Sequence, residues 1–156
     1  MPSLLTSLTG LPNAAEPVPD LITGGQPSEQ QLKAFKVAGG EVVVDNRDPM
    51  EPRPFDEPAV VRAAGLEYVN LPIVEGAATA DTMKRMHEVL RKLEGRKALV
   101  HCNSGNRTSA GLIPYLMIDQ SMEEEAAVDV AMRGGLRSAE LMELALRYVG
   151  NRSPRS

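Results

Sequence analysis

Three short apolar runs alternate with segments of helical periodicity, and this alternation limits the possible folds more than any other feature of the sequence. Residues 41–45 contain three consecutive valines, and such a continuous apolar run is typical of a strand buried on both faces. Two further strands are predicted at 66–73, where Pro72 limits the length, and at 97–100. Strands that alternate with helices predict an α/β domain with a mainly parallel central sheet flanked by helices.

Capping residues and apolar side chains spaced three and four residues apart predict the helices. Ser28 and Gln31 have the form of a capping box, and Met83, Met86 and Leu90 repeat at helical spacing. The expected helices cover residues 28–37, 59–64, 81–93, 108–119, 121–132 and 138–149. The last three leave no room for another strand near the end of the chain. The eight methionines are interpreted mainly as core-filling side chains.

The length and the distribution of prolines indicate the domain organisation. A chain of 156 residues matches one ordinary domain, which can bury a core without disulfides or a metal. Within residues 1–20, Gly10, Pro12, Pro17 and Pro19 predict an irregular N-terminal arm. We therefore expect this arm, a single domain over residues 21–150 and a flexible tail over residues 151–156.

Charge and residue content exclude several classes of function. The net charge of −4 argues against binding to nucleic acid or to an anionic membrane. No apolar run has the length of a membrane-spanning helix, about 20 residues. A single cysteine and the absence of a leader-like start favour a location in the reducing cytoplasm. The two histidines are not spaced as metal ligands, so neither a metal nor another cofactor is predicted, and His87 is interpreted as a partly exposed helix residue. No feature indicates an oligomeric state.

The single cysteine lies in a segment that has the composition of an anion-binding loop. Cys102 follows the apolar strand at 97–100 and precedes a helix, a setting in which backbone N–H groups at a helix N-terminus favour the reactive thiolate. Gly105 allows the tight curvature that aims several N–H groups at one point. Arg107 can bind two oxygens of a phosphate-like or sulfate-like group through its planar guanidinium. Although a lone cysteine is often an inert buried side chain, this setting favours a nucleophile at Cys102.

Other residues around the loop are candidates for supporting roles. His101 can orient the loop through its ring nitrogens, and Thr108 can donate a hydrogen bond to the departing sulfur. Asp45, Asn46 and Arg47 follow another strand and can line the same rim of the sheet, although polar residues in this position more commonly form turns. The candidate substrate-binding residues are Asn103, Ser104, Gly105, Asn106 and Arg107.

The chain resembles the protein tyrosine and dual-specificity phosphatase superfamily and, more narrowly, the bacterial beta-lactamase-hydrolase-like phosphatase-like family. The resemblance covers about residues 20–118 and is carried by the segments Gly24–Ser28, Val42–Arg47, Asn70–Ile73 and His101–Thr108. It implies a phosphatase-like fold and a two-step reaction. In that reaction a cysteine thiolate forms a phosphocysteine, an aspartic acid on a separate loop protonates the leaving group, and water releases phosphate.

The equivalent acid is not evident in this sequence. The loop after Pro72 offers Glu75, and the start of the next helix offers Asp81. Glu75 is slightly favoured because it lies closer to the end of the strand. Asp81 also has an ordinary structural explanation as an acidic residue in the first turn of a helix.

The length of the cysteine loop differs from that of the phosphatase pattern. Four residues separate Cys102 from Arg107, whereas the phosphatase signature has five. In this respect the loop resembles that of rhodanese sulfurtransferases, although the segment after Arg47 lacks the glycine-histidine turn usual in that family. The leading hypothesis is hydrolysis of a phosphomonoester, with sulfur transfer through a Cys102 persulfide as the alternative and an inactive oxyanion-binding module as a third. The expected partner is a phosphorylated or sulfur-donor small molecule or protein.

Overall fold

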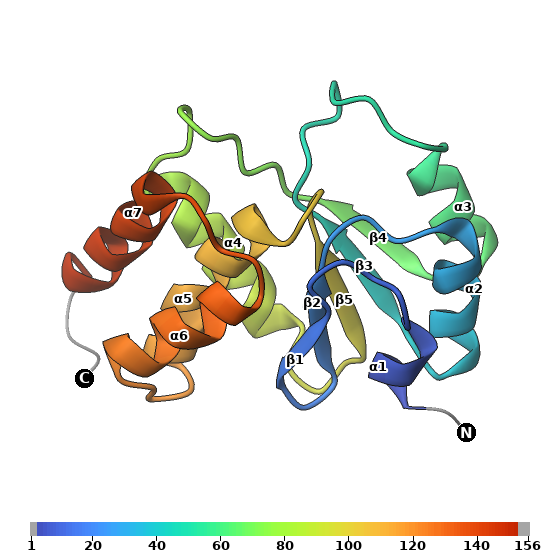
Figure 1. Ribbon diagram of the computed structural model, residues 1–156, viewed down its shortest axis with the longest axis horizontal. Coiled ribbons are helices and arrows are strands. Elements are labelled where there is room, and N and C mark those ends of the chain that lie inside the picture. Colours follow the sequence, from blue (N-terminus) through green and yellow to red (C-terminus); the bar gives the residue numbers. More distant parts are fainter. Residues whose placement is uncertain (1–2, 153–156) are drawn as a thin grey trace.

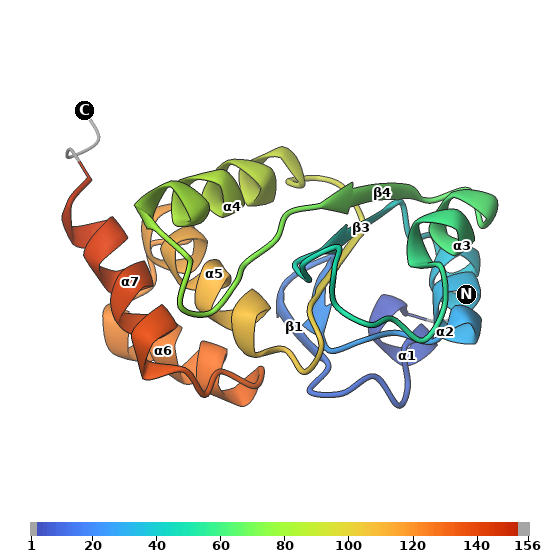
Figure 2. The ribbon, with the colours of Figure 1, turned by 90° about the horizontal axis from the view of Figure 1, so that it is seen from above.

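A five-stranded sheet separates two groups of helices in the computed structural model, which describes residues 3–152 (Figure 1). The strands are β1 (Ala15–Val18), β2 (Leu21–Gly24), β3 (Val42–Asp45), β4 (Glu67–Asn70) and β5 (Ala98–His101). The helices are α1 (Leu4–Ser7), α2 (Glu29–Val37), α3 (Glu57–Ala63), α4 (Ala80–Lys92), α5 (Asn106–Ile118), α6 (Glu124–Arg133) and α7 (Ala139–Gly150). Helices α1 to α3 cover one face of the sheet and α4 to α7 cover the other (Figures 1 and 2).

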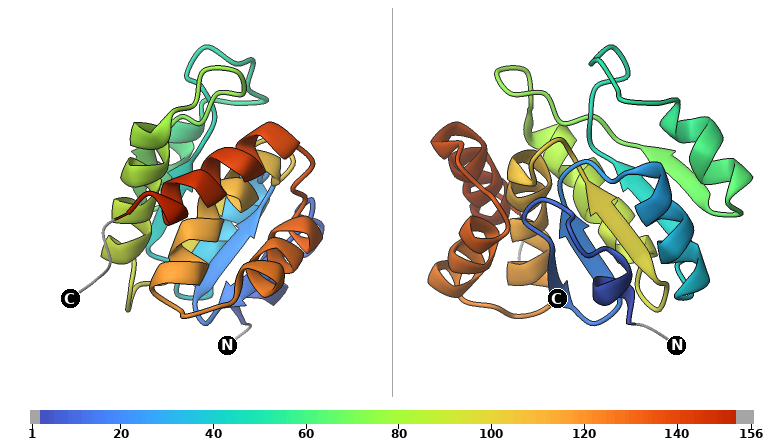
Figure 3. Two further views of the ribbon diagram at one scale, coloured as in Figure 1. Left: turned by 90° about the vertical axis from the view of Figure 1, so that its left-hand side faces the viewer. Right: turned by 45° about the vertical axis from the view of Figure 1, so that its right-hand side comes forward.

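The order of the strands is β1-β2-β5-β3-β4, and only β1 is antiparallel to its neighbour. In the parallel part, His101 pairs with both Gly24 and Asp45, and Asp45 pairs with Asn70. The four parallel strands therefore end in the same row. The loops that follow β3 and β4 both rise beyond this row (Figures 1 and 3). A sheet with this arrangement places its ligand site beyond the carboxyl ends of the strands.

The valine run of β3 shows why the central strands are apolar throughout. Val42 and Val44 pack into the core beneath α4 to α7, whereas Val43 packs into the core beneath α1 to α3. All three valines are fully buried. The side chains of a strand alternate between the faces of a sheet, so two covered faces require an unbroken apolar run. The predicted α/β class with a mainly parallel sheet is confirmed.

The N-terminal segment differs from the expected irregular arm. It contains helix α1 and strand β1, and Leu4, Leu8 and Leu11 are buried in the core beneath α1 to α3. Strand β2, which follows at residues 21–24, was also not predicted. Prolines and glycines surround both strands, and Pro17 lies within β1, so neither strand produces a periodic signal that stands out from turn composition.

Smaller differences concern the limits of elements and the burial of one histidine. The strand predicted at 66–73 ends at Asn70 instead of residue 73, because Pro72 cannot donate a ladder hydrogen bond. His87 is buried rather than partly exposed, since α7 packs across α4 and Tyr148 meets the imidazole ring. Of the expected flexible tail, residues 153–156 lie outside the described residues, while the Arg152 Nη1 atom lies 2.7 Å from His87 Nδ1. None of the described helices is long and apolar enough to span a membrane.

Candidate active site

The candidate site is built around the loop that joins β5 to α5. Cys102 directly follows β5 and is almost fully buried, and its Sγ accepts a hydrogen bond from the Gly105 N–H at 3.1 Å. Gly105 has a φ of 101°, in the left-handed region. A Cβ atom at this position would lie 2.3 Å from the Gly134 carbonyl oxygen. Both the backbone angle and the space therefore require the predicted glycine.

The loop carbonyls are held outward by the N-terminal part of the chain. The Asn103 carbonyl accepts a hydrogen bond from the Gln26 N–H at 2.9 Å, and the Ser104 carbonyl accepts one from Asn13 Nδ2 at 2.7 Å. Consecutive carbonyls fixed in this way leave the amide groups of the loop free to face the sulfur, as in an anion-binding nest. The segment that appeared to be an irregular arm thus shapes the candidate site.

The surroundings of Cys102 favour its thiolate. Burial alone would raise the pKa of the thiol. Hydrogen bonds from the backbone and hydroxyl of Thr108 and from the backbone of Gly105 and Ser104 outweigh this effect, and the pKa is lowered. The Thr108 hydroxyl also lies 2.7 Å from Asn46 Oδ1. Because the hydroxyl has one proton, it can be donated either to this amide or to the sulfur.

Arg107 is engaged by a glutamate that the sequence did not single out. Its Nη1 and Nη2 atoms lie 2.6 Å and 3.0 Å from the two carboxylate oxygens of Glu51, a bidentate ion pair. Burial lowers the pKa of the guanidinium, but the hydrogen bond to Glu51 and the charge of Cys102 raise it on balance. The hydrogen bond from Arg107, against the effect of burial, lowers the pKa of Glu51 to about 2. At neutral pH, a carboxylate therefore occupies the fork that could bind a substrate oxyanion.

Glu51 lies in the loop between β3 and α3, and two arginines tether this loop to the sheet. Arg47 donates a hydrogen bond to Gln26 and another to the Pro52 carbonyl. Arg53 lies 3.2 Å from Asp45 and donates a hydrogen bond to the Tyr68 hydroxyl at 3.0 Å. The loop is therefore fixed on both sides of Glu51.

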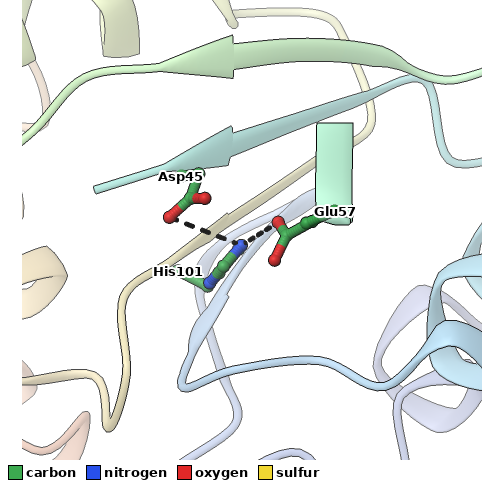
Figure 4. A group of neighbouring side chains, drawn as sticks. All are labelled: Asp45, Glu57 and His101. Carbon is green, nitrogen blue, oxygen red and sulfur yellow. Dashed lines mark hydrogen bonds and ion pairs between the residues drawn. The ribbon is translucent and has the colours of Figure 1, made fainter. Parts of the chain in front are cut away.

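His101 belongs to a buried polar network beneath the cysteine loop (Figure 4). Its Nε2 lies 2.5 Å from Glu57 Oε2 and 3.9 Å from Asp45 Oδ1, and its Nδ1 lies 3.0 Å from the Cys102 carbonyl oxygen. Burial lowers the pKa of His101, but the Glu57 hydrogen bond and the nearby negative charges outweigh it and raise the pKa. Burial raises the pKa of Glu57, but the hydrogen bond and the charge of His101 outweigh it and lower the pKa. The His101 ring thus contacts the backbone carbonyl of Cys102, which is the contact expected of a residue that orients the loop.

Asp45, Glu57 and His101 lie close enough together to suggest metal ligands. Their oxygens, however, already accept hydrogen bonds from the protein. Asp45 accepts from the Arg47 N–H and from the Tyr68 hydroxyl, and Glu57 accepts from Gln26. Carboxylates with these donors around them form a hydrogen-bonded network in preference to a cation site.

An open cavity of about 650 Å³ lies above the loop. It is lined by Asp48, Met50, Glu51, Pro52, Val74, Glu75, Asn103, Ser104, Asn106 and Arg107. The lining thus includes three carboxylates, one guanidinium and no aromatic ring.

The structure separates the two candidate acids. Glu75 lines the cavity, and its Oε1 accepts a hydrogen bond from Asn106 Nδ2 at 2.6 Å. Asp81 pairs instead with Arg85 on the exposed surface of α4, at 3.1 Å, and lines a different depression. Of the two candidates Glu75 is thus the one that lines the cavity, and its role as the general acid stays a prediction.

Most of the predicted site residues meet at this cavity or directly beneath it. Asn103, Ser104, Asn106, Arg107 and Glu75 line the cavity. The remaining predicted residues of this region are buried: His101, Cys102, Gly105 and Thr108. Three carboxylates around the site were not predicted from the sequence: Asp48, Glu51 and Glu57. Their only signal was a charged, proline-rich loop after a buried strand, which does not indicate which carboxylate reaches back to the arginine.

Several solved structures share this architecture. A putative phosphatase from Shewanella putrefaciens CN-32 matches with a TM-score of 0.79 and 23% identity over 92% of this chain and 95% of its own. The catalytic core of the PP-IP phosphatase SIW14 from S. cerevisiae, in complex with citrate, matches with a TM-score of 0.75 and 13% identity over 90% of this chain and 88% of its own. The chain therefore shares the phosphatase-like fold of these structures.

A family model identifies the group within this class. The model of the beta-lactamase hydrolase-like protein, phosphatase-like domain, matches residues 18–121, and the chain belongs to this family. A beta-lactamase hydrolase-like protein from Xylella fastidiosa is 30% identical over 91 residues, which make up 56% of this chain. The chain spans about a fifth, 21%, of the length of that relative.

Proposed function

We propose that this domain hydrolyses a phosphomonoester through a phosphocysteine intermediate at Cys102. One observation carries the proposal most directly: Cys102, whose pKa is lowered, lies beside Arg107, and Arg107 lines a cavity whose wall also holds Glu75. Nucleophile, oxyanion binder and acid are the three groups that the reaction requires.

The first step transfers the phosphoryl group to sulfur. The Cys102 thiolate attacks phosphorus while the loop N–H groups and Arg107 bind the phosphoryl oxygens. The bond from phosphorus to the leaving oxygen breaks, and protonated Glu75 gives its proton to that oxygen. Arg107 must exchange Glu51 for the substrate before this step, because one guanidinium fork cannot hold both in the same geometry.

The second step releases phosphate. A water molecule attacks phosphorus and loses a proton to the Glu75 carboxylate, and the bond between phosphorus and sulfur breaks. The Thr108 hydroxyl then donates its hydrogen bond to the departing thiolate instead of to Asn46. The cycle returns every group to its initial protonation state.

The lining of the cavity favours particular substrates. Three carboxylates around one guanidinium disfavour a polyanionic substrate, since each further phosphate would face uncompensated negative charge. Met50 and Val74, both exposed, offer apolar contacts at the cavity. We propose a small substrate with a single phosphate and a neutral or cationic remainder.

Turnover of p-nitrophenyl phosphate tests the proposal. We expect activity in the wild type and none in Cys102→Ser. Glu75→Gln should slow turnover and flatten one limb of the pH profile, whereas Asp81→Asn, a matched carboxylate change outside the cavity, should leave it unaltered. Absence of wild-type turnover from about pH 5 to about pH 7 would reject phosphomonoester hydrolysis.

Sulfur transfer is a second candidate, favoured by one specific observation. The loop between Cys102 and Arg107 has four residues, and its amide groups already converge on Sγ. With thiosulfate, the thiolate would attack the outer sulfur, the sulfur–sulfur bond would break and sulfite would leave. Cyanide would then take the outer sulfur of the persulfide as thiocyanate. Thiocyanate formation that requires Cys102, in place of phosphate release, would support this alternative, and oxyanion binding without either reaction would indicate an inactive binding module.

A further inference from the structure

We propose that Asn106 is a positioning residue, which fixes the Glu75 carboxyl in a proton-donating arrangement by tying it to the start of α7. The inference rests on the proposed phosphatase function and deepens it. Asn106 begins helix α5, directly before Arg107. From the sequence alone, Asn106 was expected only to be one of several substrate-binding residues.

The orientation of the Asn106 amide is set by its neighbours. Its Oδ1 accepts hydrogen bonds from the backbone N–H groups of Arg137 and Ser138, at 2.7 Å and 3.0 Å. Backbone N–H groups can only donate, so the oxygen must face them. The Nδ2 group is thereby directed to Glu75, where it donates to Oε1 at 2.6 Å.

This contact joins three segments that are distant in the sequence. Glu75 lies in the loop between β4 and α4, Asn106 at the start of α5, and Ser138 is the N-cap of α7 (Figure 2). Within residues 3–152, Asn106 supplies the one hydrogen bond made by the Glu75 side chain. The remainder of that side chain is exposed, so its position depends on this amide.

The chemistry of an amide suits a general acid better than a charged partner would. The Asn106 amide is neutral, so it fixes the Glu75 carboxyl through a hydrogen bond without placing a second charge next to it. The Nδ2 group occupies Oε1 as an acceptor, so the acidic proton is carried by Oε2. This proton passes to the leaving oxygen as its bond to phosphorus breaks.

Two substitutions separate positioning from a general structural role. Asn106→Asp keeps an oxygen for the Arg137 and Ser138 N–H groups but places a second carboxylate oxygen against Glu75. Asn106→Ala removes both contacts. Melting curves identify any loss of folding, and Asn106→Asp is the informative variant if Asn106→Ala unfolds.

The readout compares two substrates that need an acid to different extents. Phenyl phosphate has a poorer leaving group than p-nitrophenyl phosphate and depends more on protonation. For Asn106→Asp we expect kcat with phenyl phosphate to fall on the order of 100-fold, with a much smaller fall for p-nitrophenyl phosphate and little change in KM. In a Glu75→Gln background, the same substitution should have almost no further effect on kcat.

The outcomes distinguish this inference from the proposed function. Equal losses with both substrates, or an undiminished loss in the Glu75→Gln background, would overturn the positioning role and leave phosphatase function intact. Wild-type enzyme that hydrolyses neither substrate would overturn the function itself, and with it the acid that Asn106 is proposed to position. The selective loss in kcat supports both.

Discussion

At the scale of single residues, the ion pair between Arg107 and Glu51 has the clearest consequence for ligand binding. The carboxylate holds both terminal nitrogens of the guanidinium, and only 14% of the Arg107 side chain is exposed. An incoming oxyanion must therefore displace an internal anion of similar shape. The affinity of the free site for anions is therefore lowered by the free energy of the ion pair between Arg107 and Glu51, because this pair must break before an anion binds.

Replacement of Glu51 by glutamine should tighten anion binding. The amide keeps the size of the side chain but removes its charge, so Arg107 is released at lower cost. Charge-assisted hydrogen bonds contribute about 1.5–3 kcal/mol, and we expect the Kd for inorganic phosphate to fall roughly tenfold. Calorimetric titration of Glu51→Gln measures it, with Asp81→Asn as the control. Weaker binding would instead show that Glu51 organises Arg107 for its ligand.

The pH dependence of this pair follows from the lowered pKa of Glu51. The pKa of the carboxyl is 4.5 in the unfolded chain and about 2 in the folded protein. Its contribution to stability is present above pH 4.5 and is lost as the pH falls toward about 2. Protonation therefore does not release Arg107 near neutral pH, and displacement by an anion is required.

Gly105 allows a second residue-scale prediction with a matched control. Gly105→Ala combines a left-handed φ with a Cβ placed 2.3 Å from a carbonyl oxygen, whereas Gly95→Ala has a φ of 80° and nothing within 4 Å. Left-handed backbone alone costs alanine about 1–2 kcal/mol. We expect urea denaturation to show about that loss for Gly95→Ala and a clearly larger one for Gly105→Ala. Equal losses would mean that the loop moves away from Gly134.

At the scale of elements, the N-terminal segment is part of the core. Leu8 follows α1 and is fully buried, whereas Leu5 within α1 is 37% exposed. Truncation of a buried leucine to alanine costs about 2–5 kcal/mol. Leu8→Ala should therefore lower the free energy of unfolding by this amount, and Leu5→Ala by much less. A negligible effect of Leu8→Ala would restore the interpretation of this segment as a dispensable arm.

The elements also show what could be predicted from the sequence and what could not. The valines of β3 and the methionines of α4 could be predicted from the local sequence pattern, because these apolar residues are also the buried ones. Strand β2 depends on pairing with β5, which is distant in the sequence, and β1 in turn pairs with β2. The contact of Glu51 with Arg107 likewise spans more than fifty residues and follows from the path of a loop. The reactive residues of the site could thus be recognised by their residue type, whereas the residues that contact them became known only from the structure.

At the scale of the whole molecule, its two histidines should give opposite pH dependences of stability. The pKa of His101 is raised, so its contribution is full below the unfolded value of 6.5 and is lost as the pH rises through the folded value. The pKa of His87 is lowered, chiefly by burial. Protonation of His87 thus favours unfolding as the pH falls below 6.5.

Denaturation at about pH 5 and about pH 8 separates these contributions. His87→Gln should increase stability at the acidic pH relative to the alkaline pH, compared with the wild type. His101→Gln should shift the balance in the opposite direction. Shifts of the same sign in both variants would contradict the assignment of the two environments.

The outer strands of the sheet have a consequence for behaviour at high concentration. Unpaired backbone groups at a sheet edge invite strands of another molecule, and such pairing leads to aggregation. At one edge, β1 contains Pro17, which lacks an N–H, and its register with β2 is irregular. At the other edge, β4 carries exposed Glu67. The same short, proline-containing strand that escaped sequence prediction therefore protects the sheet against edge-to-edge growth.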